Sequence, residues 1–149
     1  ANKIYATANV GLKFKSKFIL PMSSAVTSAF GTARVFNGTL KSYHGGTDFR
    51  AAVGTSVIAA NDGVVVIAKD RYYAGGSVVI DHGEGIYTQY YHLSVLNVKV
   101  GQSVKKGDII ALSGASGRVS GPHLHFGVIA SGVQVNPINF VKKINEILN

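Results

Sequence analysis

The sequence predicts an all-β fold: an antiparallel β-sandwich or half-barrel with a groove and a short C-terminal helix. Short runs rich in Val and Ile follow one another between residues 45 and 129, separated by turn sequences such as 61–63 and 75–76. Glycine accounts for 18 of the 149 residues, about 12% against a usual ~7%. No stretch with helical periodicity interrupts this region. These observations favour strands joined by tight turns.

Seven strands are expected in this region, at Thr47–Ala51, Ser56–Ala60, Gly63–Ala68, Ser77–Asp81, Ile86–His92, Asp108–Ser113 and His123–Ala130. The segment Gly54–Val57 resembles Gly101–Val104, and each is followed by a turn and an apolar run. This repeat suggests a duplicated hybrid motif, in which two similar β units pack face to face.

The two ends of the chain differ from the middle. Residues 1–18 are expected to form an N-terminal arm, a linker or a strand from a preceding region, and residues 19–149 a single domain. Residues 10–20 alternate apolar side chains with Lys13, Lys15 and Lys17, which predicts a strand with one solvated face. After Asn136-Pro137 a short amphipathic helix is expected to cap the domain, with one apolar face formed by Ile138, Val141, Ile144 and Leu148.

The composition narrows the possible partners. The formal net charge is +8, which favours an anionic partner such as nucleic acid, a membrane surface or a wall polymer. No Lys/Arg block lies beside stacked aromatic residues, so no nucleic-acid partner is expected. The absence of cysteine excludes thiolate metal sites, and no apolar run approaches the ~18 residues of a transmembrane segment. We expect a processed chain or an excised domain, because the sequence starts at Ala1 without a visible signal peptide.

Two histidines one residue apart, His123 and His125, are the strongest sign of a functional site. In a strand both imidazoles point to one face, while Leu124, Phe126 and Val128 point to the other. Histidine is the commonest metal ligand and titrates near neutral pH. The pair therefore suggests a metal or catalytic site on an open face of the sheet.

A second group precedes the first predicted strand. In a straight strand His44 and Asp48 would lie ~13 Å apart, but the two glycines between them allow a sharp bend. Two histidines and one aspartate match the three protein ligands of a catalytic zinc site, although Asp48 could instead cap a turn. The second histidine of the pair would then be a general base or a charge stabiliser. His92 ends an aromatic strand and is either a site residue or a structural one, whereas His82 is interpreted as a turn residue.

Four motifs in this order resemble those of the lysostaphin/LytM-type zinc peptidases. They are His44–Phe49, Gly54–Val65, Tyr90–Ser94 and Gly121–Phe126, and the runs Gly107-Asp108 and Gly114–Gly117 also sit where that family has similar ones. The resemblance covers about residues 19–140, so residues 19–149 are interpreted as the catalytic domain. It implies a compact antiparallel β fold, one Zn²⁺ per chain and cleavage of peptide bonds in bacterial peptidoglycan.

The resemblance also assigns roles to residues. His44, Asp48 and His125 would be the zinc ligands, and His92 and His123 the non-ligand histidines beside the attacking water. One of these two would take a proton from that water, with His123 favoured, and the other would stabilise the oxyanion. Residues 34–38 resemble Gram-negative members, which favours a D-Ala–diaminopimelate cross-link over pentaglycine, and a periplasmic or cell-envelope location. Candidate substrate contacts are Arg34, Asn37, Tyr43, Tyr72 and Tyr73.

Two alternatives remain. The same fold could form a non-enzymatic wall-binding or amidase-activating module, and metal analysis would separate that from an enzyme. A carrier or phosphotransfer domain is a weaker alternative: the turn at Lys105–Gly107 lacks the flanking residues of a carrier motif, and a phosphotransfer site would not need Asp48. A regulatory preceding domain or partner protein is also possible.

Overall fold

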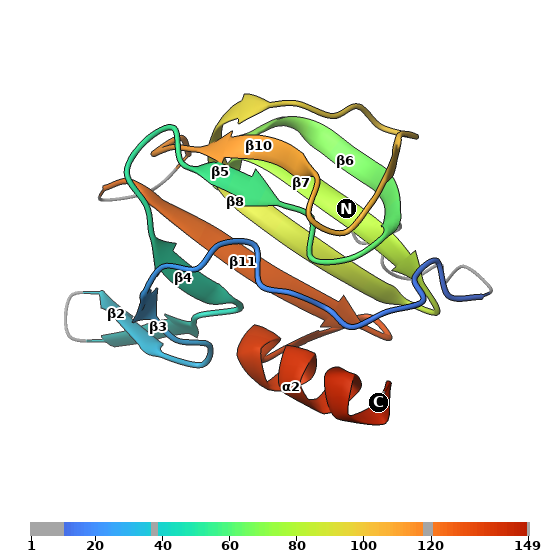
Figure 1. Ribbon diagram of the computed structural model, residues 1–149. Coiled ribbons are helices and arrows are strands. Elements are labelled where there is room, and N and C mark those ends of the chain that lie inside the picture. Colours follow the sequence, from blue (N-terminus) through green and yellow to red (C-terminus); the bar gives the residue numbers. More distant parts are fainter. Residues whose placement is uncertain (1–10, 37–38, 118–120, 149) are drawn as a thin grey trace.

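One large antiparallel sheet dominates the computed structural model, which describes residues 11–36, 39–117 and 121–148 (Figure 1). The strands of this sheet follow the order β1-β4-β11-β8-β7-β6-β9. Their bounds are β1 Val26–Ser28, β4 Thr47–Arg50, β6 Gly63–Arg71, β7 Gly75–Gly83, β8 Ile86–Leu96, β9 Ser103–Val104 and β11 His123–Ala130. The predicted antiparallel all-β fold is confirmed.

A second, smaller layer is formed by β5 (Ser56–Ile58) and β10 (Ile109–Ser113), which lie in front of the large sheet in Figure 1. β8 connects the two layers: up to Tyr91 it pairs with β11, and from Leu93 it pairs with β10. A strand that changes partners in this way needs a bulge or a bend. The bend falls at His92, whose φ of 65° lies in the left-handed region.

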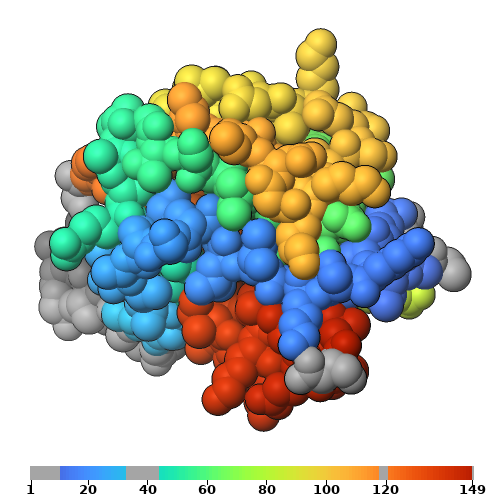
Figure 2. Space-filling model, viewed as in Figure 1, coloured from blue at the N-terminus to red at the C-terminus, as the bar shows by residue number. Residues whose placement is uncertain are grey.

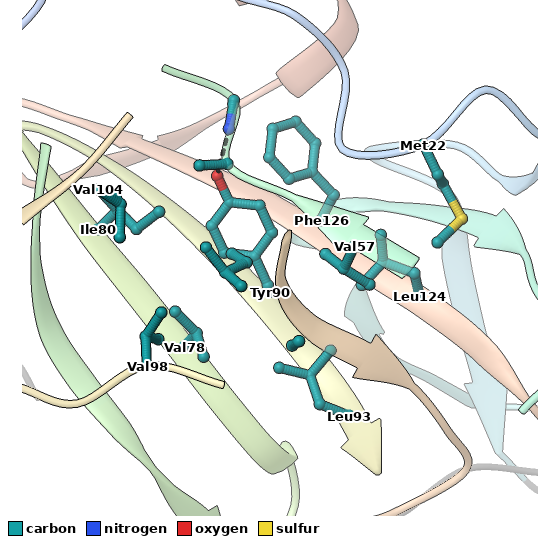
Figure 3. Packing of buried hydrophobic residues seen from close by; sticks show 14 of the residues in the cluster. Met22, Val57, Val78, Ile80, Tyr90, Leu93, Val98, Val104, Leu124 and Phe126 are labelled. Atoms are coloured by element: carbon teal, nitrogen blue, oxygen red, sulfur yellow. Dashed lines mark hydrogen bonds between the residues drawn. The ribbon is translucent and has the colours of Figure 1, made fainter. Parts of the chain in front are cut away.

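The main hydrophobic core fills the space between the two layers. Val57 of β5, Val78 of β7 and Tyr90 of β8 are completely buried there, together with Leu124 and Phe126 of β11 (Figure 3). Because side chains alternate along a strand, the neighbours of these residues point to the opposite face of the large sheet. That face carries a second cluster of four buried residues, Ile67, Val79, Tyr87 and Ile129.

All seven predicted strands are present, but several of their ends were predicted wrongly. β8 continues to Leu96 rather than ending at His92, since the bend at His92 redirects the strand without terminating it. Five strands of two to five residues were not predicted. They are β1, β9, β12 (Val133–Val135), which pairs with β11, and the separate hairpin of β2 (Ala33–Phe36) and β3 (Thr39–Tyr43).

The predicted strand at residues 10–20 is wrong for its described part, residues 11–20, which form no strand. The alternation instead buries Phe14 and Phe18 in the main core and leaves the three lysines exposed. The segment is attached by single backbone hydrogen bonds, such as Lys13 N to the His82 carbonyl at 2.8 Å. Figure 2 shows it in blue, crossing the surface between the C-terminal helix in red and the strand layers above.

The helix predicted after Asn136 is confirmed as α2, Pro137–Ile147. The Asn136 side chain accepts a hydrogen bond from the backbone N–H of Asn139, as an N-cap residue does. Phe140, Val141, Ile144 and Leu148 pack against the main core. Ile138, which was predicted on this face, is 38% exposed, and Phe140 takes its place. No helix in the described part of the chain has the length and apolarity to cross a membrane.

His82 is a buried residue of β7 and not the turn residue that the sequence suggested. Its Nδ1 lies 2.7 Å from the Asp62 carbonyl oxygen, and its Nε2 lies 2.7 Å from the Thr88 hydroxyl. That hydroxyl contacts the hydroxyl of Tyr90, which accepts the Ala60 N–H drawn as a dashed line in Figure 3. In this row of hydrogen bonds every donor is matched with an acceptor if His82 is neutral and carries its proton on Nδ1.

This network predicts a loss of stability in acid. Burial lowers the pKa of His82 from 6.5 to about 4, so below pH 6.5 the unfolded chain binds a proton that the folded chain does not. The free energy of unfolding should therefore fall as the pH drops from 6.5 to 4, by about 3 kcal/mol from His82 alone. Urea unfolding of the unmodified protein and of His82→Gln at several pH values isolates the contribution of His82 to this pH dependence. Equal pH slopes in the two proteins would contradict the prediction.

Candidate metal centre

Three predicted ligands converge at one end of the large sheet, where β4 and β11 lie side by side (Figure 1). Asp48 of β4 and His125 of β11 are directly paired across the two strands, and His44 lies just before β4. Asp48 Oδ1 lies 3.0 Å from His44 Nε2 and 3.1 Å from His125 Nδ1. The two ring nitrogens are 3.1 Å apart. The three donor atoms thus form a nearly equilateral triangle.

This donor set fits a zinc ion. Nitrogen and oxygen ligands bind zinc at ~2.0–2.1 Å in a tetrahedron, which places them roughly 3.3 Å apart, close to the observed spacing. With a metal bound, both site-facing ring nitrogens would be unprotonated, and the cation would offset the repulsion between their lone pairs and the carboxylate. Among the residues that the structure describes, His44, Asp48 and His125 are the group of side chains placed to hold a metal ion together.

The two glycines before Asp48 provide both the bend and the space that this convergence needs. The backbone bends at Gly46, as expected from the sequence, although neither glycine has a positive φ. A Cβ on Gly46 would come within 2.6 Å of His125 Nε2 and of the Phe126 carbonyl oxygen, and one on Gly45 would collide with the Gln134 amide. Glycine at position 46 therefore allows His44 and β11 to approach this closely, because the Phe126 backbone cannot move aside as the exposed Gln134 side chain can.

The orientation of the His44 ring is fixed by contacts of its Nδ1, on the side away from Asp48, with the end of the short strand β1 and the residue that follows it. Its Nδ1 lies 3.2 Å from the Ala29 carbonyl oxygen and 3.2 Å from the Ser28 hydroxyl. Donation of the Nδ1 proton to that carbonyl leaves a lone pair on Nε2, the nitrogen that faces Asp48. The role of Ser28 and Ala29 could not be predicted, because β1 is only three residues long and Ala29 follows it.

The electrostatics of the triangle favour an ionised carboxylate between neutral imidazoles. Burial acts to raise the pKa of Asp48, but the interactions of its carboxylate with the His125 and His44 rings outweigh it and hold the pKa well below its usual range. Burial lowers the pKa of His125, against the opposing effect of its hydrogen bond to Asp48. Neutral imidazole and ionised carboxylate are the forms in which these side chains bind metal.

The two remaining histidines of the predicted site, His92 and His123, face each other beside the triangle, with ring centroids 4.8 Å apart. His92 Nδ1 lies 2.9 Å from the Ser116 carbonyl oxygen, and His123 Nδ1 lies 3.0 Å from the Gly121 carbonyl oxygen. Both rings therefore carry their proton on Nδ1 and present an accepting Nε2. His123 Nε2 is 3.6 Å from Asp48 Oδ2, while burial lowers the pKa of His92 to about 4. All five predicted histidine and aspartate residues are thus brought together.

Ser116 holds His92 in place, and the sequence pointed to its loop without identifying this role. Its carbonyl accepts from His92, and its hydroxyl donates to the Leu93 carbonyl at 2.6 Å and accepts the Gly76 N–H at 3.0 Å. These contacts surround His92, whose backbone is left-handed. That conformation costs of order 1–3 kcal/mol and needs support from its surroundings.

We expect Ser116→Ala to lower kcat about tenfold without releasing metal. The change removes both hydroxyl contacts beside His92 and leaves His44, Asp48 and His125 untouched, and small displacements of a reacting group are costly. Steady-state kinetics with metal analysis checks this, and Ser94→Ala, which loses a hydroxyl contact to Ser113 nearby, is the matched control. Equal kcat values for the two variants would show that Ser116 does not position His92.

The predicted substrate contacts are only partly described. Tyr72 and Tyr73 lie in the turn between β6 and β7, are 78% and 63% exposed and pack edge to face at 4.7 Å. This turn adjoins the loop of Ser116, since a Cβ on Gly117 would meet the Tyr73 carbonyl oxygen at 2.5 Å. Asn37 lies outside the described residues, and for Arg34 and Tyr43 only the strand backbone is described. Their substrate contacts stay predictions.

Two histidines and an aspartate on an open antiparallel sheet, with two accepting histidines beside them, are the features of a metallohydrolase. Residues 42–137 match the model of peptidase family M23. The peptidoglycan DD-endopeptidase ShyA of Vibrio cholerae is 52% identical over 93 residues, which are 62% of this chain and 22% of ShyA. The chain therefore belongs to peptidase family M23, and the predicted family is confirmed.

Solved structures agree with this result. A zinc-containing peptidase from Vibrio cholerae is 38% identical with a TM-score of 0.74, over 83% of this chain and 39% of that one. The catalytic domain of lysostaphin from Staphylococcus simulans is 33% identical with a TM-score of 0.70, over 80% of this chain and 92% of that one. This chain spans about a fifth to a quarter of the length of the curated relatives ShyA, ShyB and ShyC.

Proposed function

We propose that this chain is a zinc-dependent peptidoglycan hydrolase of the DD-endopeptidase type. The observation that carries the proposal is the convergence of His44, Asp48 and His125 on one point. The DD-endopeptidase names of ShyA, ShyB and ShyC support the substrate class. Residues 19–149 are proposed as the catalytic domain, to which the preceding segment adds Phe14 and Phe18 as core packing.

His44 through Nε2, Asp48 through Oδ1 and His125 through Nδ1 are the proposed ligands. A zinc ion held by them would supply a Lewis acid that polarises the scissile carbonyl and makes water a stronger nucleophile near neutral pH. The strands keep the ligands in position, because Asp48 and His125 are anchored by the β4–β11 ladder and His44 by the Ala29 carbonyl.

We assign proton transfer to His123. Its Nε2 is an acceptor, it shares β11 with His125, and Asp48 lies close enough to stabilise the imidazolium that forms. The same proton can then pass to the leaving amine. His92 is assigned to the opposite side of the reacting carbonyl, where its Nε2, after taking up a proton from solvent, hydrogen-bonds the oxyanion, whose negative charge stabilises the imidazolium.

The proposed substrate is the D-Ala–diaminopimelate cross-link of bacterial peptidoglycan, and the proposed location is the periplasm or cell envelope of a Gram-negative bacterium. The organism of the ShyA, ShyB and ShyC relatives supports this location. The net charge of +8 suits an anionic wall polymer, and such attraction weakens as salt is added.

Digestion of defined cross-linked muropeptides, read by mass spectrometry, tests the proposal. We expect cleavage of the D-Ala–diaminopimelate bond, its loss after treatment with a chelator and its recovery when zinc is added back. If metal analysis shows that the chelator has removed the zinc and cleavage still continues, the zinc mechanism is rejected. A metal-free protein that activates a partner amidase would instead support the non-enzymatic alternative.

A further inference from the structure

Arg71, at the end of β6, lies on the same face of the large sheet as the metal centre. From Ile67 onward β6 pairs regularly with β7, so Ile67, Lys69 and Arg71 share one face. That face is the one with the second hydrophobic cluster, where Ile67 packs with Tyr87 and Tyr91 borders the cluster. Neighbouring strands lie ~4.8 Å apart, so the Arg71 backbone is three strand spacings from that of His125.

The Arg71 side chain reaches back toward the site across Tyr91. Its guanidinium carbon lies 4.9 Å from the centre of the Tyr91 ring, within the range of a cation–π interaction. The Tyr91 ring is stacked on the His125 ring at 9° with centroids 5.3 Å apart. The Nε of Arg71 donates to the Ser77 hydroxyl at 3.3 Å. The guanidinium is thus held within about 10 Å of a proposed zinc ligand.

This guanidinium has no carboxylate partner among the residues that the structure describes, where the ion pairs found all involve Asp48 and a histidine. The Arg71 side chain is half-buried, and the sequence has only seven acidic residues. A partly desolvated guanidinium normally binds a carboxylate or phosphate through its planar array of donors. An oriented guanidinium without a carboxylate partner beside a catalytic centre is available to bind an anionic group of a substrate.

We propose that Arg71 binds the diaminopimelate carboxylate next to the scissile amide and so selects cross-links in which this carboxylate is free. The inference rests on the proposed function, since it requires a D-Ala–diaminopimelate substrate. In that substrate the carboxylate is attached to the carbon that bears the scissile nitrogen, a few ångströms from the reacting carbonyl. A substrate strand crossing from the metal centre over Tyr91 brings this carboxylate toward the Arg71 guanidinium.

The test compares two cross-linked muropeptide dimers that differ only in this carboxylate, free in one and amidated in the other. For the unmodified protein we expect amidation to lower kcat/KM about 10- to 100-fold, the usual range for a charge-assisted hydrogen bond. Arg71→Gln should cleave both dimers at the low rate of the amidated one. Arg71→Lys should retain part of the preference, because it keeps the charge without the planar fork. Lys69→Ala, an exposed cation on the same face of β6, is the control and should behave as the unmodified protein.

A second measurement separates substrate recognition from support of His125. Zinc affinity, measured by competition with a chelator, should be the same in Arg71→Gln as in the unmodified protein. Weaker zinc binding with equal losses on both dimers would mean that Arg71 positions His125 through Tyr91, and would overturn the proposal. Equal cleavage of both dimers by the unmodified protein would reject it without any variant. Cleavage of neither dimer would reject the proposed function as well.

Discussion

Asp48→Ala is expected to abolish both zinc binding and peptidase activity. Asp48 Oδ1 is the atom that both His44 and His125 approach, so its removal leaves two imidazoles without the anionic ligand between them. Loss of a partner outside the ligand set typically costs 10- to 100-fold in metal affinity, and we expect a loss of more than about 100-fold for a ligand itself. Metal content after dialysis and muropeptide turnover measure the two effects.

Asp70→Ala is the matched control for this variant, because Asp70 is an exposed carboxylate of β6. It should retain one zinc per chain and full turnover. Thermal unfolding of both variants in the presence of a chelator shows whether the fold survives without the metal. An Asp48→Ala protein that still holds zinc at the affinity of the unmodified chain would remove Asp48 from the ligand set.

His123→Ala is expected to lower kcat by about 10²- to 10⁴-fold while zinc remains bound, as for the loss of a general base. The side chain contributes its Nε2 to the site and lies beside the three proposed ligands without belonging to them. Added imidazole should restore part of the activity, because truncation leaves room for a small base at the position of the ring. Kinetics with and without imidazole, together with metal analysis, check this result.

His92→Ala provides the comparison. It should also lose activity, but imidazole should restore less, since its ring occupies a more enclosed position held by the Ser116 carbonyl. If imidazole rescues His92→Ala and not His123→Ala, then the two assignments must be exchanged. Full activity of His123→Ala would reject its role in proton transfer altogether.

The sequence determined the large features of the fold. Alternation and turn residues predicted seven strands, and the strand His123–Ala130 was predicted with both of its ends. A period of two residues is sufficient for this, because it decides which side chains face the core and which the site. The same period places the imidazoles of His123 and His125 on one face of their strand, whatever residues lie opposite them. The wrong strand at residues 10–20 shows the limit, since Phe14 and Phe18 alternate with lysines but pair with no strand.

The assembly of the site depends on contacts between strands that are distant in the sequence. Asp48 meets His125 because β4 lies beside β11 in one particular register, and His92 faces His123 because β8 bends as it passes from one layer to the other. The role of Gly46, the support from Ser28 and Ser116 and the position of Arg71 over Tyr91 likewise depend on residues distant in the chain. Local sequence fixes the direction of a side chain relative to its own strand. Which side chains meet depends on strand order and register, which are set by the packing of the whole domain.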